Sequence, residues 1–176
     1  SHPDFFSAAN ELAAYREQKD GIHTIVVSPQ QIYNEFSSAA QDITAIRDFI
    51  RYLYKKPNSQ LKYLLLLGDA SYDPLNRVSN NSNFVPSYQS NNSVSPVHSF
   101  VTDDYFGLLD DIEGNFANDL VDIGIGRFPV QSLSEANDMV LKVKNYNGPL
   151  AKGDWRNRVT FIGDDGDAND GNTHMA

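Results

Sequence analysis

Acidic side chains stand directly after two apolar segments of the chain, where a buried strand would end. Residues 63–67 (YLLLL) lead into Gly68 and Asp69, and residues 159–162 (VTFI) lead into the acidic stretch 163–167 (GDDGD). Ligands of open α/β sheets bind beyond the carboxyl ends of the strands, and hard cations take several oxygen ligands together. The pattern predicts either a carboxylate cluster for a divalent cation or a cationic substrate group, or aspartates that only cap turns.

A second group of carboxylates lies in the middle of the chain. Asp103 and Asp104 precede one apolar segment, and the turn 110–114 (DDIEG) and Asp119 follow it. This group is interpreted either as a second cation site or as a solvated acidic turn. Together with Asp69 at the first strand end, Asp103 and Asp104 are therefore the candidate metal ligands of the chain.

Several other chemistries lack the residues that they require. The chain has no cysteine, which excludes disulfides, thiolate metal sites and a catalytic thiol within these 176 residues. The four histidines lack the i, i+4 spacing of a helical zinc pair, and no serine stands in a G-x-S-x-G motif. Residues 165–176 begin like an EF-hand loop, but they lack its Gly at the sixth position and its Glu at the twelfth.

The composition is that of a folded, acidic protein. Hydrophobic residues make up 40% of the chain and charged residues 21%, and the formal net charge is -9. This length and balance suit one domain with its own core, and the scattered basic residues argue against nucleic acid as a partner. No apolar run approaches the roughly 20 residues that a membrane-spanning helix needs, so any export signal is expected outside this chain.

The spacing of apolar residues predicts alternating helices and strands in the first part of the chain. An amphipathic helix is expected over residues 4–19, a β-branched strand over 23–28, and a second helix between an N-cap at Asp42 and a break at Pro57. The fully apolar strand 63–67 follows. Strands and helices joined by short connections are typical of parallel crossover units, so we expect a mostly parallel sheet with helices on both faces.

The remainder of the chain is expected to be less regular. Residues 69–100 are rich in Asn and Ser and predict a long irregular loop. The elements predicted after it are strands over 105–109 and 120–125, a helix that begins at a capping box of Ser132 and Glu135, a last strand over 159–162, and an acidic tail over 163–176. The chain is therefore predicted to be a single α/β unit over residues 1–176.

Six motifs along the chain carry a resemblance to a known family. They are 31–38 (QIYNEFSS), 44–49 (TAIRDF), 64–74 (LLLLGDASYDP), 84–86 (FVP), 102–107 (TDDYFG) and 122–129 (DIGIGRFP). In this order they resemble the gingipain family of cysteine peptidases, and most of all the branch that acts as the sortase of the type IX secretion system in Bacteroidetes. The resemblance spans nearly the whole chain.

The resemblance implies a caspase-like α/β catalytic domain that is built from two side-by-side subdomains. In the family, the nucleophilic Cys and a His within a Gly-His-Gly motif lie in the second subdomain, and this chain has neither feature. It is therefore expected to be the first, non-catalytic subdomain of a gingipain-like cysteine endopeptidase or transpeptidase, truncated after its last strand and inactive alone. Its expected partners are the second catalytic subdomain of the same polypeptide and a protein or peptide substrate.

The same resemblance extends to location, substrate and metal. The parent protein is expected to be secreted or attached to the outer membrane or cell surface, and an exposed apolar face at the truncation would favour self-association. The acidic loop lies near the S1 pocket of arginine-specific family members, so the candidate substrate-binding residues are Asp164, Asp165 and Asp167. No cofactor is required, but the resemblance includes calcium as a bound ion.

Two alternatives to a peptidase subdomain remain open from the residues themselves. One is a divalent-cation-binding module without catalysis. The other is a magnesium-dependent hydrolase that uses the strand-end aspartates Asp69, Asp164 and Asp165, although the chain lacks a D-x-D motif after its first predicted strand. A dependence of folding stability on calcium or magnesium would favour these alternatives.

Overall fold

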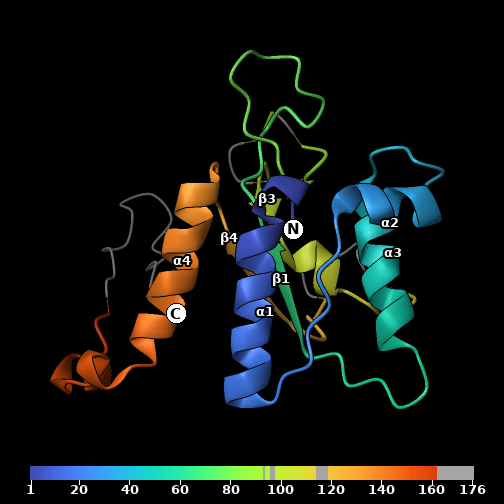
Figure 1. The fold of residues 1–176 in the computed structure, drawn as a ribbon. Helices are drawn as coiled ribbons and strands as arrows, with labels where there is room; N and C mark the ends of the chain where they lie inside the picture. The colour runs from blue at the N-terminus through green and yellow to red at the C-terminus, as the bar shows by residue number, and fades with distance from the viewer. Residues whose placement is uncertain (93, 96–97, 114–118, 162–176) are drawn as a thin grey trace, which may run out of the picture. The chain divides into compact units, whose positions relative to one another are not determined.

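The computed structural model, shown in Figure 1, describes residues 1–92, 94–95, 98–113 and 119–161. The chain forms two compact units, residues 1–143 and residues 144–176, which are described separately. The larger unit contains both helices and strands, as the apolar pattern predicts. Among the described residues, no helix is both long and apolar enough to cross a membrane.

Two small sheets form the framework of the larger unit. Strands β1 (Tyr63–Leu67) and β4 (Gly124–Phe128) pair in parallel at its centre. Parallel neighbours need a long connection, and in this connection β2 (Tyr88–Gln89) and β3 (Val101–Thr102) form an antiparallel pair. The parallel pairing of the central strands agrees with the predicted sheet type, and β1 has the predicted bounds.

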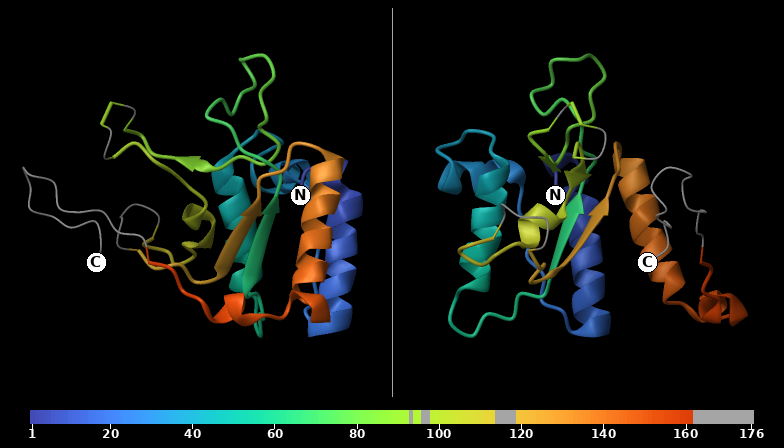
Figure 2. Two further views of the ribbon diagram at one scale, coloured as in Figure 1. Left: turned by 90° about the vertical axis from the view of Figure 1, so that its left-hand side faces the viewer. Right: turned by 180° about the vertical axis from the view of Figure 1, so that it is seen from behind.

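Helices α1 (Phe6–Asp20) and α4 (Leu133–Tyr146) lie on one side of β1 and β4, as Figure 2 shows. Each fully buried Leu or Phe side chain in such a core contributes about 1.5–3 kcal/mol. The core on this side consists of Phe5, Ala8, Ala9, Leu12, Leu67, Val130, Ala136 and Val140.

Helices α2 (Pro29–Phe36) and α3 (Ile43–Tyr54) lie on the opposite side of the central sheet (Figure 2). Successive residues of a strand point to opposite faces, so Leu66 packs on this side and Leu67 on the other. The prediction of helices on both faces is therefore confirmed. The core on this side consists of Ile32, Tyr33, Ala45, Ile46, Leu66, Val85 and Phe106.

Local hydrogen bonds at the helix ends explain where these helices begin and stop. Gly21 ends α1 in the left-handed conformation, with φ of 66°. The Ser28 hydroxyl accepts from the N–H of Gln31 at 3.1 Å, and the Gln31 side chain accepts from the N–H of Ser28 at 2.8 Å, a complete capping box for α2. The Asp42 carboxylate accepts from the N–H of Thr44 at 2.8 Å and caps α3, as predicted.

Residues 23–28 differ from the prediction, because they are not a strand. Val26 packs against the core beneath α1 and Val27 against the core beneath α2 and α3, so the side chains alternate as in a strand. However, residues 23–28 form no ladder with a neighbouring strand in the part of the chain that the structure describes. The helix α2 directly after this segment was not predicted.

Residues 105–109 also differ from the predicted strand. They lie partly in a 3-10 helix, Asp104–Gly107, in which the N–H of Phe106 donates to the Asp103 carbonyl at 3.1 Å and the Phe106 ring is fully buried. The next strand, β4, begins at Gly124 and not at residue 120. The segment that separates these two elements is therefore longer than predicted.

The smaller unit contains the end of α4 and two 3-10 turns, Pro149–Ala151 and Asp154–Asn157. The Arg156 guanidinium lies 4.2 Å from the centre of the Tyr146 ring, a cation–π contact. Residues 159–161 are not in a strand, which contradicts the predicted last strand as far as the described residues extend.

Candidate functional site

The candidate site is the carboxyl edge of the central sheet. The ends of β1 and β4, Leu67 and Phe128, lie opposite each other. Beyond them the Gly68 N–H donates to the Phe128 carbonyl at 3.0 Å, and the Asp69 N–H donates to the Val130 carbonyl at 3.0 Å. A loop over residues 69–84 and the β2–β3 hairpin both leave the sheet at this edge (Figure 2).

Asp69 closes the base of the loop. One carboxylate oxygen accepts from the N–H of Ala70 at 2.9 Å. The other accepts from the Ser82 hydroxyl and from the Gln131 side-chain amide, both at 2.8 Å. Both oxygens therefore have protein donors, and Asp69 acts in this structure as a turn-capping residue.

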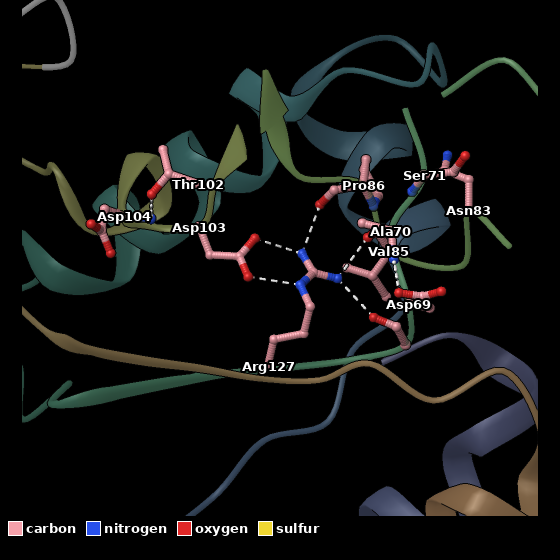
Figure 3. Close-up of polar contacts among 11 residues, drawn as sticks. Asp69, Ala70, Ser71, Asn83, Val85, Pro86, Thr102, Asp103, Asp104 and Arg127 are labelled. Atoms are coloured by element: carbon pink, nitrogen blue, oxygen red, sulfur yellow. Dashed lines mark hydrogen bonds and ion pairs between the residues drawn. The ribbon is translucent and has the colours of Figure 1, made fainter. Parts of the chain in front are cut away.

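Arg127, on β4, is the centre of the polar contacts at this edge (Figure 3). Its Nε and Nη2 each donate to one carboxylate oxygen of Asp103 at 2.7 Å, a bidentate ion pair. Its Nη1 donates to the carbonyls of Gly68 at 2.7 Å and Val85 at 2.8 Å, and its Nη2 also donates to the Pro86 carbonyl at 3.1 Å. All five N–H groups of the guanidinium thus have an acceptor.

This arginine is partly buried, with 12% of its side chain exposed. A charge in such a position is stable only when it is paired and its hydrogen bonds are satisfied. Removing one member of a buried ion pair typically costs about 3–5 kcal/mol, because the other charge is left without a partner. Arg127 and Asp103 therefore form a structural centre of the edge, which the sequence analysis did not identify.

The three candidate metal ligands do not form a cluster. Asp103 is paired with Arg127, Asp69 faces Ser82, and the backbone of Asp104 donates to the Thr102 hydroxyl at 3.1 Å. Among the described residues, no group of three or more His, Cys, Asp or Glu side chains could hold a metal ion. The carboxylates of Asp69 and Asp103 do not fit a calcium site in this arrangement, and metal binding stays a prediction.

The predicted substrate-binding residues, Asp164, Asp165 and Asp167, lie outside the described residues. Their proposed role in selecting a basic side chain therefore stays a prediction.

The acidic turn after the 3-10 helix is held by the basic side of α3. Arg47 donates to the carbonyls of Leu108 and Glu113 at 2.5 and 2.7 Å, and Arg51 donates to the Asp110 carbonyl at 2.8 Å. These two arginines and Lys55 are four residues apart in sequence, so they share one face of the helix.

The last of these three basic residues, Lys55, forms an ion pair with Asp111. The hydrogen bond and the charge of Lys55 lower the pKa of the Asp111 carboxyl below its ordinary value. Residues 110–112 are exposed, so the described part of the turn agrees with the solvated acidic turn of the sequence analysis, and α3 supplies positive charge beside it.

A shallow, open depression lies beside the loop 69–84, with a volume of about 380 Å³. Partial burial lowers the pKa of His2, one of its lining residues, so this imidazole is mainly neutral at pH 7. The lining is therefore uncharged and rich in side-chain amides. Its members are His2, Asn76, Val78, Asn80, Asn81, Asn83 and Phe84.

One feature of the sequence could have identified Arg127 as a structural residue. An arginine that stands between apolar residues in a strand is rarely buried unless it is paired, so its position predicts a carboxylate partner. The identity of that partner depends on tertiary structure, because Asp103 lies 24 residues earlier in the chain. No local spacing rule connects the two residues.

Comparison with known proteins identifies a matching family and a similar solved structure. The sequence model of Peptidase family C25 matches residues 1–176. The crystal structure of dimeric latent PorU from Porphyromonas gingivalis is 33% identical to the chain, with a TM-score of 0.73. The similarity covers 92% of this chain and 16% of the PorU chain. No curated protein matches the chain.

The comparisons agree with the motifs and with the fold. Four of the six motifs that carry the resemblance meet at Arg127, which itself belongs to motif 122–129. Its acceptors belong to the three others: Gly68 to 64–74, Val85 and Pro86 to 84–86, and Asp103 to 102–107. The parallel sheet with helices on both faces is similar to the corresponding part of PorU. The predicted α/β fold class is thereby confirmed, and the chain belongs to peptidase family C25, the gingipain family.

Proposed function

We propose that this chain is the first, non-catalytic subdomain of a gingipain-like cysteine endopeptidase or transpeptidase. The observation that carries the proposal is the match to Peptidase family C25 over all 176 residues, in a chain that contains no cysteine. A cysteine peptidase needs a thiolate nucleophile and a neighbouring histidine that raises the thiolate fraction. Both groups would come from a second catalytic subdomain of the same polypeptide.

The contribution of this chain would be structural support for the catalytic subdomain and for the substrate. Catalytic groups work only when their surroundings hold them in a fixed geometry, and the partly buried Arg127–Asp103 pair would supply such support at the carboxyl edge. Bound substrate would be a protein or peptide. The parent protein would be secreted or attached to the cell surface, as the resemblance to the type IX secretion branch implies.

The similarity to PorU supports a larger parent protein. The matched region is 16% of the PorU chain, and that structure is described as dimeric and latent. From this similarity we extend only the larger size of the PorU chain to this protein. Its peptidase activity would then depend on further parts of the polypeptide. Self-association through an exposed apolar face of the subdomain is a further part of the proposal, which sedimentation of the purified chain tests directly.

A peptidase assay on two proteins tests the proposed function. The full-length parent protein is expected to cleave or transfer a peptide substrate, and iodoacetamide is expected to abolish this activity because it alkylates the thiolate. Residues 1–176 alone are expected to be inactive. Turnover by these residues alone, or turnover by the parent that a thiol reagent does not affect, would contradict the proposal.

The same proteins test the magnesium-dependent hydrolase, the alternative that the family match does not favour. Assays of phosphomonoester hydrolysis with magnesium and with a chelator are expected to show no activity for either protein. Magnesium-dependent hydrolysis by residues 1–176 would instead support the role of the strand-end aspartates, with Asp69→Asn as the variant that should abolish it.

A further inference from the structure

Arg127 binds both ends of two separate segments. Its Nη1 donates to the carbonyls of Gly68 and Val85, which immediately flank the loop 69–84. The rest of the guanidinium binds Pro86 and Asp103, which flank the β2–β3 hairpin (Figure 3). One side chain therefore joins the two ends of the loop to the two ends of the hairpin.

The base of the loop is also closed by its own backbone. The carbonyl of Asp69 accepts from the N–H groups of Phe84 and Val85 at 2.9 and 3.0 Å. Farther out, the Asp73 carboxylate accepts from the N–H of Val78 at 2.7 Å. The loop is thus internally ordered. Its base is held against the hairpin by Arg127 and by a hydrogen bond from Gln89 Nε2 on β2 to the Ser71 carbonyl at 2.9 Å.

The two segments differ in charge from the rest of this acidic protein. Residues 70–101 contain six Asn residues, whereas Asp73 and Arg77 are their only Asp, Glu, Lys or Arg residues, in a chain with a net charge of -9. The side chain of Asp73 is buried. Their exposed apolar residues include Tyr72, Leu75, Val78, Phe100 and Val101.

Such a surface matches one class of ligand. Side-chain amides donate to and accept from peptide groups, and exposed aromatic and aliphatic side chains pack against apolar ones. A cationic ligand would lose its hydration here without gaining an ion pair, and an anionic one would find Arg77 as its single exposed charged partner among the described residues 70–101. The chemistry therefore favours an extended, uncharged stretch of polypeptide.

We propose that Arg127 is a positioning residue that fixes the loop 69–84 and the β2–β3 hairpin as one surface for an uncharged stretch of a polypeptide substrate. This inference rests on the proposed peptidase function for the identity of the polypeptide as substrate. The positioning itself follows from the four chain positions that the guanidinium contacts.

The test uses the full-length parent protein with Arg127→Lys, and Arg47→Lys as a matched control. Lysine keeps the charge but cannot satisfy the bidentate and carbonyl contacts together. Arg47 is buried, with 8% exposed, and also donates to two backbone carbonyls, but these belong to residues 108–113 and not to the loop or the hairpin. It also lies 5.1 Å from the centre of the Tyr105 ring, which stacks on Tyr88 of β2, and the positive charge of lysine can retain this cation–π contact. Both variants are expected to lower stability, and only Arg127→Lys should alter the proposed surface.

Two readouts are measured on each protein. Hydrogen exchange should become faster in Arg127→Lys over both the loop and the hairpin, whereas in Arg47→Lys it should become faster only near residues 105–113. Fluorescence anisotropy measures binding of a labelled, uncharged peptide of Asn, Ser and Leu. A Lys-substituted version of the peptide is the control, because an acidic protein attracts a cationic peptide non-specifically. The uncharged peptide should bind more tightly to the wild type, and Arg127→Lys should weaken this binding by about tenfold.

Each outcome bears on the inference. In Arg127→Lys, faster exchange in only one of the two segments would overturn it. Equal loss of binding in Arg47→Lys, or preference of the wild type for the Lys-substituted peptide, would also overturn it. If Arg127→Lys does not fold, Asp103→Asn replaces it; the expected result is then faster exchange in the hairpin with an unchanged loop, and weaker binding. A lack of thiol-dependent peptidase activity in the parent would refute the proposed function, while the exchange and binding results would still decide the positioning role.

Discussion

Gly68 and Val85 approach each other so closely that no side chain fits at position 68. A Cβ atom on Gly68 would lie 2.9 Å from Val85 Cγ2, and the backbone of Gly68 has φ of 139°, a conformation that other residues rarely adopt. This contact brings the end of β1 against the end of the loop 69–84. Both carbonyls are then within reach of Arg127, which donates to each of them.

The first prediction concerns this close approach. Gly68→Ala should lower the free energy of unfolding by about 2–4 kcal/mol, because it combines backbone strain with a steric clash. Gly21→Ala is the control: Gly21 also has a positive φ, of 66°, but a Cβ there would meet nothing within 4 Å, so a loss of about 1 kcal/mol is expected. Urea unfolding measures both, and equal losses would contradict the close contact.

The elements with strong local signals were predictable from the sequence. The strand 63–67 is apolar at every position, and α3 has both an apolar stripe and a capping aspartate, so pattern and local chemistry agree. Residues 23–28 were predicted wrongly for a tertiary reason. Their alternation places Val26 and Val27 in two different cores, but a strand also requires a partner ladder, which no local pattern reveals.

The second prediction concerns α2, the helix that the sequence analysis missed. Its signal was present, because Ser28, Pro29 and Gln31 are the N-cap, N1 and N3 residues of a capping box. Ser28→Ala should therefore lower the free energy of unfolding by about 1 kcal/mol. The exposed Ser79→Ala is the control, with an expected change within about 0.5 kcal/mol. A neutral Ser28→Ala in thermal or urea unfolding would show that the cap does not stabilise α2.

The candidate site was predictable only as a region. Asp69 was identified from the sequence as a carboxylate at a strand end and Asp103 as one that precedes an apolar segment, and in the structure both lie at the carboxyl edge. Their partners could not be read from the sequence, because Ser82, Gln131 and Arg127 reach them only through the fold. A carboxylate next to a strand end thus predicts a position more reliably than it predicts a ligand.

The third prediction separates metal binding from these hydrogen bonds. If calcium stabilises the protein, replacing calcium by a chelator should lower the melting temperature. This decrease should be the same in the wild type, in Asp69→Asn and in Asp103→Asn. The reason is that protein donors already occupy both oxygens of each carboxylate. Differential scanning calorimetry measures the difference for each protein. A calcium effect that disappears in Asp69→Asn would instead identify Asp69 as a ligand.

The fourth prediction concerns alkaline pH and Tyr33 on α2. Burial, with a smaller effect of the Asp42 charge, raises the pKa of Tyr33 to about 12, from an ordinary value of about 10. The folded state therefore keeps this proton over a range in which the unfolded state loses it. The resulting contribution to stability is fully present below pH 10 and is lost as the pH rises from about 10 to 12, by a total on the order of 2 kcal/mol.

Tyr33→Phe tests this directly, because phenylalanine cannot ionise. The Tyr33 hydroxyl is buried and has no hydrogen-bond partner among the described residues, so its removal should leave the stability at pH 7 unchanged or raise it by up to about 1 kcal/mol. Between pH 10 and 12 the variant should lose less stability than the wild type. The exposed Tyr72→Phe is the control and should follow the wild type at every pH. A Tyr33→Phe variant that is clearly less stable at pH 7 would mean that the hydroxyl has a partner after all, and parallel curves above pH 10 would contradict the raised pKa.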